Sequence, residues 1–241
     1  MKKYLVSTAL ALTLTALPGL ALAECGSDED FGAYIRQIEG GGKGYEATNP
    51  GSSATGAYQF LIGTLKELGY VQHYSGPASS YFGDSGWNDV VWTGKDGINS
   101  RAEFMASQGA QDRAFAEFTQ RNLQAVAGNW TPGETVNGIQ MTSGGVAAAT
   151  HMLGVGGFRQ WAASGFSASG LDPKIAAAHG WSPEQYNKHL MNRVAKGGCM
   201  DPNDITIGND AIAELPEVFL MPFMAKPGKP VIIPGRIASV L

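Results

Sequence analysis

The first clear pattern of apolar and polar positions predicts an amphipathic helix that ends at Glu39. Its large apolar residues recur at i, i+3, i+4 and i+7, a spacing that indicates one buried face: Phe31, Tyr34, Ile35 and Ile38. Ser27 and Asp28 precede this face and are natural N-caps. The glycines at positions 40 to 42 stop the helix just after Glu39. We therefore expect a short helix with one buried side and a glutamate at its foot.

Glu39 is the first candidate for chemistry. It lies at the border of the apolar face and at the negative end of the helix dipole, and both effects disfavour a carboxylate and raise its pKa. A carboxylic acid that keeps its proton near neutral pH is what cleavage of a glycosidic bond needs as a general acid. Standing alone, however, Glu39 fits a solvated glutamate before a glycine stop, and the sequence that follows decides between the two interpretations.

Downstream of Glu39, residues 53–64 read SATGAYQFLIGT. Together with Glu39, this stretch resembles the Glu…Gly-Leu-Met-Gln…Gly-Thr signature of lytic transglycosylases, in the lysozyme-like superfamily. In that family the glutamate is the catalytic acid/base, and the Gly-x-x-Gln segment starts a helix that lines the sugar groove. The resemblance implies a catalytic Glu39, with Gln59 and its neighbour Tyr58 binding substrate. Tyr58 and Phe60 stand where the family usually has other apolar residues, which marks a distant branch.

Two later segments extend the resemblance. Residues 144–158 read GGVAAATHMLGVGGF, and so many small residues let a helix pack closely against a neighbour. A similar family helix reads Ala-Ala-Tyr-Asn-x-Gly, which puts His151 in the place of the asparagine near the cleft; a core histidine bonded to backbone is the alternative. Ser182 and Pro183 open another helix, whose Tyr186 resembles the family tyrosine that approaches the catalytic glutamate. His151 and Tyr186 complete the expected substrate-binding set.

The ends of the chain predict export. Lys2 and Lys3 precede an apolar run that closes on Ala21-Leu22-Ala23, which predicts a signal peptide over residues 1–23, cleaved after Ala23. Cys25 would suit a lipoprotein, but Glu24 occupies the place where a lipobox has glycine or alanine. No later stretch is apolar and long enough to predict a membrane span. We expect a periplasmic or secreted protein.

The net charge and the cysteines limit the classes of partner and cofactor that we expect. The formal net charge is −4, and loss of the two signal-peptide lysines makes it more negative, which argues against nucleic acid as a partner. Cys25 and Cys199 are the two cysteines, and oxidising conditions favour a disulfide that ties the domain ends together; two free thiols are the alternative. Neither the cysteines nor the histidines have zinc-ligand spacing, so we expect no metal and no cofactor.

The middle of the chain predicts a long loop and a helical scaffold. Residues 71–100 are rich in Gly, Ser, Asn, Asp and aromatic residues, typical of a long ordered loop. Its rings either stack on sugars or anchor the loop to the core: Tyr74, Tyr81, Phe82, Trp87 and Trp92. A hydrolase would need a second acid, with four candidates here and just upstream: Glu46, Asp84, Asp89 and Asp96.

After this loop, the sequence predicts a helical scaffold. It opens on a capping box at Ser100 and Glu103, and its helical pieces over 101–108 and 111–127 break near Gly109. The second piece has a predicted polar side, made of Asp112, Arg113, Glu117 and Arg121.

We thus expect a mainly α protein with a lysozyme-like helical domain over residues 24–200 and long loops. Residues 201–241 form an extended proline-rich tail, which docks on the protein's own surface or on an envelope or secretion-system protein. The resemblance implies a peptidoglycan-cleaving glycosidase, with peptidoglycan glycan strands as partner. A lytic transglycosylase is favoured, acting on the MurNAc–GlcNAc β-1,4 bond with Glu39 as general acid/base. The alternatives are a hydrolytic lysozyme (muramidase) and a non-catalytic peptidoglycan-binding component of an envelope or secretion machine.

Overall fold

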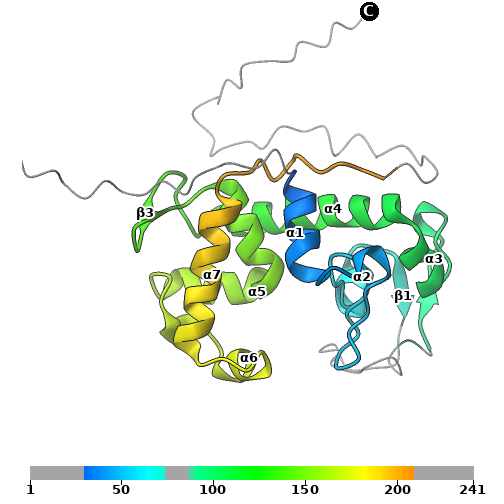
Figure 1. Ribbon diagram of the computed structural model, residues 1–241, viewed down its shortest axis with the longest axis horizontal. Coiled ribbons are helices and arrows are strands. Elements are labelled where there is room, and N and C mark those ends of the chain that lie inside the picture. Colours follow the sequence, from blue (N-terminus) through cyan, green and yellow to red (C-terminus); the bar gives the residue numbers. More distant parts are fainter. Residues whose placement is uncertain (1–29, 74–86, 88, 209–241) are drawn as a thin grey trace, which may run out of the picture. The chain divides into compact units, whose positions relative to one another are not determined.

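The computed structural model describes residues 30–73, 87 and 89–208, and within these ranges the protein is mainly helical, as the sequence predicted (Figure 1). The predicted signal peptide, Cys25 and residues 209–241 of the tail lie outside the described residues. Internal contacts divide the described chain into two units. We call residues 30–124 with 202–208 the discontinuous unit, and residues 125–201 the inserted unit.

Helix α1 spans Phe31–Glu39 and opens the discontinuous unit. Its predicted end is confirmed, since Gly40 is the C-cap and donates its N–H to the Arg36 carbonyl. Its N-cap is Asp30 rather than Ser27 or Asp28, because Asp30 directly precedes the first helical residue and accepts the Ala33 amide at 2.6 Å. The predicted buried face is one residue too long: Ile38 keeps 39% of its surface exposed.

The segment after α1 is irregular. A 3₁₀ turn at Gly44–Glu46 leads into antiparallel bridges that pair Thr55 with both Thr48 and Phe60. Between the bridges lies a tight turn over residues 56–59, closed by a hydrogen bond from the Gln59 amide to the Gly56 carbonyl at 3.1 Å. Gly56 and Gln59 have φ angles of 77° and 52°, outside the range of a right-handed helix. The Gly-x-x-Gln segment therefore forms a turn, and helix α2 begins only afterwards, at Ile62, and ends at Glu67.

Two short strands and two helices complete this unit. Strands β1 (Val71–His73) and β2 (Val91–Trp92) pair antiparallel across the predicted loop. Helix α3 (Arg101–Ala106) has the predicted cap, because the Ser100 hydroxyl accepts the Glu103 amide. Helix α4 (Gln108–Val126) runs straight through Gly109. The predicted break lies instead at Ser107, whose extended backbone (ψ 102°) separates α3 from α4.

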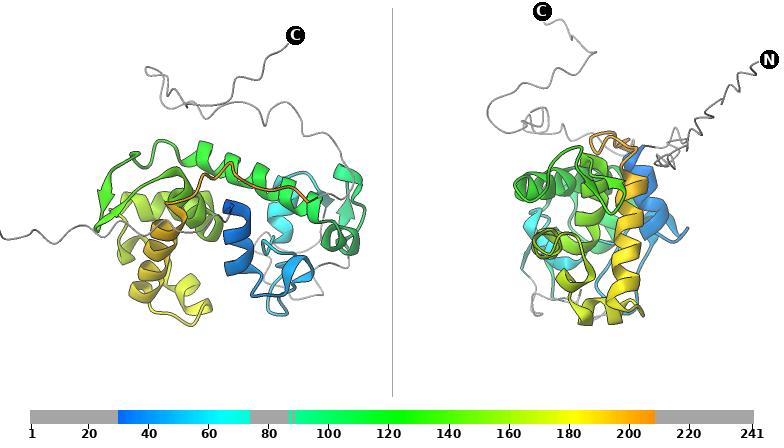
Figure 2. Two further views of the ribbon diagram at one scale, coloured as in Figure 1. Left: turned by 45° about the horizontal axis from the view of Figure 1, so that its top comes forward. Right: turned by 90° about the vertical axis from the view of Figure 1, so that its left-hand side faces the viewer.

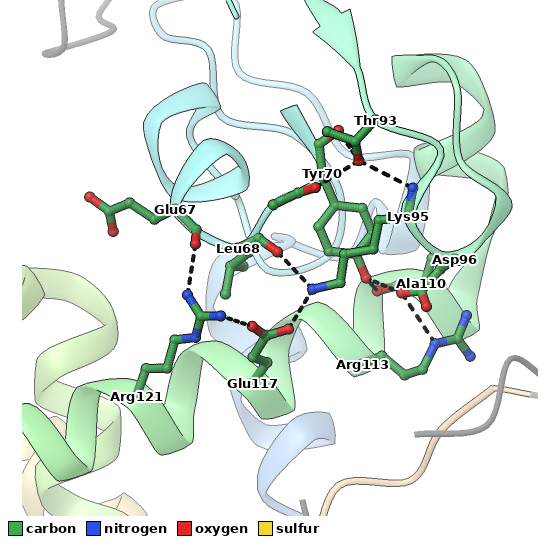
Figure 3. A network of polar contacts seen from close by, with 11 residues as sticks. Glu67, Leu68, Tyr70, Thr93, Lys95, Asp96, Ala110, Arg113, Glu117 and Arg121 are labelled. Atoms are coloured by element: carbon green, nitrogen blue, oxygen red, sulfur yellow. Dashed lines mark hydrogen bonds and ion pairs between the residues drawn. The ribbon is translucent and has the colours of Figure 1, made fainter. Parts of the chain in front are cut away.

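A polar network joins α4 to the loop that contains residues 93–97 (Figure 3). Lys95 Nζ donates to the Leu68 carbonyl and to Glu117, each at 2.6 Å, and Arg121 pairs with the same glutamate. Asp96 accepts the Tyr70 hydroxyl and pairs with Arg113 Nε at 3.4 Å. Since Arg113 is only 6% exposed, its predicted place on a solvated polar side of α4 is wrong; it lies in this network.

The inserted unit is built around α5 (Ser143–Ala163) and α7 (Pro183–Gly197). The hairpin β3 (Thr135–Val136) and β4 (Ile139–Gln140) precedes them, and the short helix α6 (Pro173–Ala178) lies between them in sequence. The predicted close packing is confirmed, because a methyl group on Gly144 would lie 2.2 Å from the Gly197 carbonyl oxygen. The predicted start of α7 is confirmed as well, with a full capping box between Ser182 and Gln185.

Helix α5 is kinked within its length. Gly154 has φ 64° and ψ 172°, a conformation open to glycine and costly for other residues. The kink follows His151 by one helical turn, so the continuous helix predicted over residues 144–158 is two helical pieces. None of the described helices is both long and apolar enough to cross a bilayer.

Residues 202–208, the start of the predicted tail, return to the discontinuous unit. The Phe31 amide donates to the Asp204 carbonyl at 2.9 Å, and the Gly208 amide donates to Asp112 Oδ2 at 2.9 Å. The segment (orange in Figures 1 and 2) runs alongside α1 and α4. This described part of the tail therefore docks on the protein itself, which was one of the two predicted options.

Candidate functional site

Glu39 lies half-buried at the C-terminal end of α1. The next residue, Gly40, faces the turn over residues 56–59: a methyl group on Gly40 would lie 3.4 Å from the Ala57 carbonyl oxygen. The backbone that carries Glu39 is thus in contact with the turn that carries Gln59. The structure brings together the two segments on which the resemblance to lytic transglycosylases depends.

Gln59 has a strained backbone, with its φ of 52° in the left-handed region. Its side-chain amide nitrogen donates to the Gly56 carbonyl at 3.0 Å and so ties the turn to itself. The side chain is half-buried. Backbone strain of this kind persists only where the surroundings enforce it, which indicates that the turn is held firmly in place.

Tyr58, the second predicted substrate-binding residue, is 0% exposed. Its ring stacks on Phe115 with centroids 4.1 Å apart, its hydroxyl donates to Asp112 Oδ1 at 2.6 Å, and it accepts from Arg36 Nη1 at 2.7 Å. Burial, followed by the charge of Asp112, raises the pKa of the Tyr58 hydroxyl. A ring without exposed surface cannot contact a glycan directly, so Tyr58 holds the turn rather than the substrate.

Two residues of α4 that the sequence interpretation did not assign to the candidate site hold this turn. Gln111 is fully buried: its Oε1 accepts the Ala57 amide at 2.8 Å, and its Nε2 donates to the Phe104 carbonyl at 2.9 Å. Asp112, predicted on a polar side, is also 0% exposed. The missed signal was their spacing of four and three residues from Phe115, which places both on its buried side of α4.

The hydrogen bonds of Asp112 come from four parts of the unit. Oδ1 accepts from Tyr58, from the Tyr45 hydroxyl at 2.9 Å and from Arg36 Nη1 at 3.3 Å. Oδ2 accepts from the Gly208 amide. Burial, followed by the charge of Asp112, raises the pKa of Tyr45 as well. The carboxylate therefore joins α1, the turn, α4 and the returning segment.

The candidates for a second carboxylate have different surroundings. Asp96 is engaged by Tyr70 and Arg113 in the network of Figure 3, which leaves its side chain 14% exposed. Glu46 and Asp89 are exposed, and Asp84 lies outside the described residues. Asp96 thus has a structural role, whereas Glu46 and Asp89 are open to solvent.

His151 and Tyr186, the remaining predicted site residues, belong to the inserted unit. His151 is half-buried on α5. Tyr186 on α7 is 1% exposed and stacks on His179, with centroids 5.4 Å apart. The predicted site residues therefore form two groups, with Glu39, Tyr58 and Gln59 in the discontinuous unit.

The described aromatic residues of the predicted loop anchor it. Trp87 stacks on Trp92 with centroids 6.0 Å apart, and Trp92 packs on Phe104 at 6.1 Å. The Arg101 guanidinium lies 4.8 Å from the Trp87 ring centroid, within cation–π range. These contacts favour the anchoring interpretation for both tryptophans. The other three rings, Tyr74, Tyr81 and Phe82, lie outside the described residues.

Residues 30–73, 87 and 89–208 contain no group of three or more His, Cys, Asp or Glu side chains able to hold a metal ion. Cys199 is disulfide-bonded, and Cys25 lies outside the described residues.

The chain matches no protein-family model, no curated protein and no solved structure.

Proposed function

We propose that this protein is a lytic transglycosylase that cleaves the MurNAc–GlcNAc β-1,4 bond of peptidoglycan, with Glu39 as general acid/base. The observation that carries the proposal is the position of Glu39, half-buried at the end of α1 and beside the firmly held turn of Gln59. The negative end of a helix and partial burial both favour a protonated carboxyl. The lytic-transglycosylase signature in the sequence supports the same assignment.

The proposed reaction needs one carboxyl group. Protonated Glu39 donates its proton to the glycosidic oxygen as the bond to the MurNAc anomeric carbon breaks. The resulting carboxylate then takes the proton from a hydroxyl of the same MurNAc, whose oxygen forms the new bond to the anomeric carbon and closes an anhydro ring. Glu39 ends the cycle protonated, with no water consumed and no cofactor needed. Gln59 would orient the sugar beside it.

The decisive experiment is Glu39→Gln, assayed on purified sacculi. The amide cannot exchange a proton, so we expect a loss of cleavage of at least about 100-fold, with an unchanged thermal unfolding midpoint. Glu67→Gln is the matched control, because Glu67 is likewise the last residue of a helix and its side chain is exposed; it should cleave at the wild-type rate. Wall clearance by Glu39→Gln at the wild-type rate would refute the proposal.

Product analysis separates the alternatives. Anhydro-muropeptides, identified by mass, are expected from a transglycosylase, whereas reducing ends would identify a muramidase. In the second case Glu46 and Asp89 are the exposed acids to test, because a hydrolase needs a second carboxylate. Binding to sacculi without release of fragments would favour the non-catalytic component of an envelope or secretion machine. All three alternatives are compatible with export to the periplasm or beyond it.

A further inference from the structure

The discontinuous unit is completed by a segment that arrives after the inserted unit. Residues 202–208, here called the return segment, make backbone contacts at both ends. Near its start, the Asp204 carbonyl accepts the amide of Phe31, one of the first helical N–H groups, which have no partner within their own helix. Ile205 lies against Gly32, with a side-chain carbon 3.1 Å from where a methyl on Gly32 would be. The return segment thus fixes the N-terminal end of α1.

At its other end, the return segment supplies a donor to a fully buried charge. Asp112 is 0% exposed, so water cannot replace a missing donor. The Gly208 amide reaches Oδ2 at 2.9 Å, and the hydroxyl of Tyr45 is the other donor near that oxygen, at 3.2 Å. An ionised group without sufficient donors is costly to bury. The position of Asp112 therefore depends on the return segment.

Asp112 in turn holds the candidate site. Its Oδ1 takes the Tyr58 hydroxyl, which fixes the turn over residues 56–59 against the end of α1 at Gly40. We infer that the return segment is a positioning element of this site: it fixes α1 through Phe31, and through Asp112 it sets the turn that carries Gln59 beside Glu39. Where it concerns catalysis, this inference rests on the proposed function.

The test compares Gly208→Pro with Gly208→Ala in the full-length protein. Proline removes the N–H that Asp112 accepts, whereas alanine keeps it. We expect the proline variant to increase amide hydrogen exchange at Ala57 and Tyr58 at least about tenfold and to lower the turnover of sacculi about tenfold, because a misplaced positioning element costs rate. KM should change little, and the alanine variant should behave as wild type in both measurements.

A second pair of variants tests the inference in case the proline variant does not fold. Ile205→Ala loosens the contact with Gly32, and Thr206→Ala, at an exposed neighbour, is its control. If exchange at the turn stays at the wild-type rate in both Gly208→Pro and Ile205→Ala, the inference is wrong, whatever the protein catalyses. If exchange rises but cleavage is unchanged, the turn does not position the reaction and the inference also fails. If exchange rises while even the wild type cleaves nothing, the proposed function fails and the structural coupling is supported.

Discussion

Asp112 shows how a single buried carboxylate can organise a site. It lies in α4, has no exposed surface, and takes hydrogen bonds from residues before and after it in the chain. The sequence interpretation placed it on the polar side of the helix, because buried carboxylates are rare, although its spacing from Phe115 puts it on the buried side. The donors that make its burial possible are brought by tertiary contacts, and this is why the sequence interpretation missed it.

Replacing this carboxylate should destabilise the protein strongly. Asp112→Ala removes the carboxylate that accepts from Arg36 and from the hydroxyls of Tyr45 and Tyr58. We expect the free energy of unfolding to fall by about 3 kcal/mol, which is typical of a broken buried pair. Urea denaturation measures it. Asp204→Ala removes an exposed carboxylate from the return segment and keeps its backbone contact, so a loss within about 0.5 kcal/mol is expected there. Equal losses in the two variants would contradict the role of Asp112.

Two buried tyrosines and one half-buried tyrosine predict a loss of stability at alkaline pH. Burial is the first cause that raises the pKa of Tyr45, Tyr58 and Tyr70 above the ordinary value of 10.0. Above pH 10 the unfolded chain releases these protons while the native protein keeps them, so the unfolded state binds fewer protons and stability falls as pH rises. Below pH 10 the three hydroxyls contribute no pH dependence. Denaturant midpoints against pH, with the tyrosinate absorbance followed in parallel, measure the effect; a flat profile above pH 10 would refute it.

At the scale of elements, capping signals that act through neighbouring residues predicted helix boundaries correctly, whereas boundaries set by distant contacts were missed. Gly40 at the end of α1, and Ser182 and Pro183 at the start of α7, act through their own backbone and neighbours, and these boundaries are confirmed. The start of α2 and the junction of α3 with α4 were predicted wrongly. In the first case the left-handed turn at Gln59 is stabilised by Gln111 and Asp112, which are distant in sequence. No local pattern could have indicated it.

The close contact of α5 with α7 makes its own prediction. A methyl on Gly144 would lie 2.2 Å from the carbonyl oxygens of Gly197 and Met200, so Gly144→Ala should cost about 1–3 kcal/mol through overpacking. Gly156, in the second piece of the same helix, has nothing within 4 Å of such a methyl. Gly156→Ala should therefore be neutral or stabilising by up to about 1 kcal/mol. Thermal unfolding of both variants checks the difference, and a stable Gly144→Ala would contradict the packing.

At the scale of the whole molecule, the sequence marked a change of character near residue 201 and left open whether the chain beyond it docks on the protein or on a partner. The prolines predicted an extended segment, and its described part docks on the protein: Pro202 is buried, and residues 202–208 belong to the discontinuous unit. The sequence did not predict that the candidate residues belong to two units. A single sequence shows which residues resemble a signature, but not to which unit each residue belongs.

This architecture predicts different outcomes for two truncations. A chain that ends at Gly208 keeps the contacts to Phe31 and Asp112, and it should unfold near the temperature of the full-length protein. A chain that ends at Asp201 loses both contacts. We expect its discontinuous unit to lose about 2–4 kcal/mol, because Phe31 loses its acceptor and the buried Asp112 carboxylate loses a donor. Calorimetry of the two chains decides the matter. Equal unfolding temperatures would show that the return segment is dispensable.

The bond from Gly208 to Asp112 spans 96 positions of the chain, and this separation orders the events of folding. Contacts so distant in sequence form slowly, since a long loop must close before they can stabilise anything. During synthesis, the inserted unit is complete once residue 201 has emerged, whereas the unit with Glu39 must wait for the residues that follow. The surroundings of Glu39 are therefore the last part of the described chain to be completed, after residue 208 has left the ribosome.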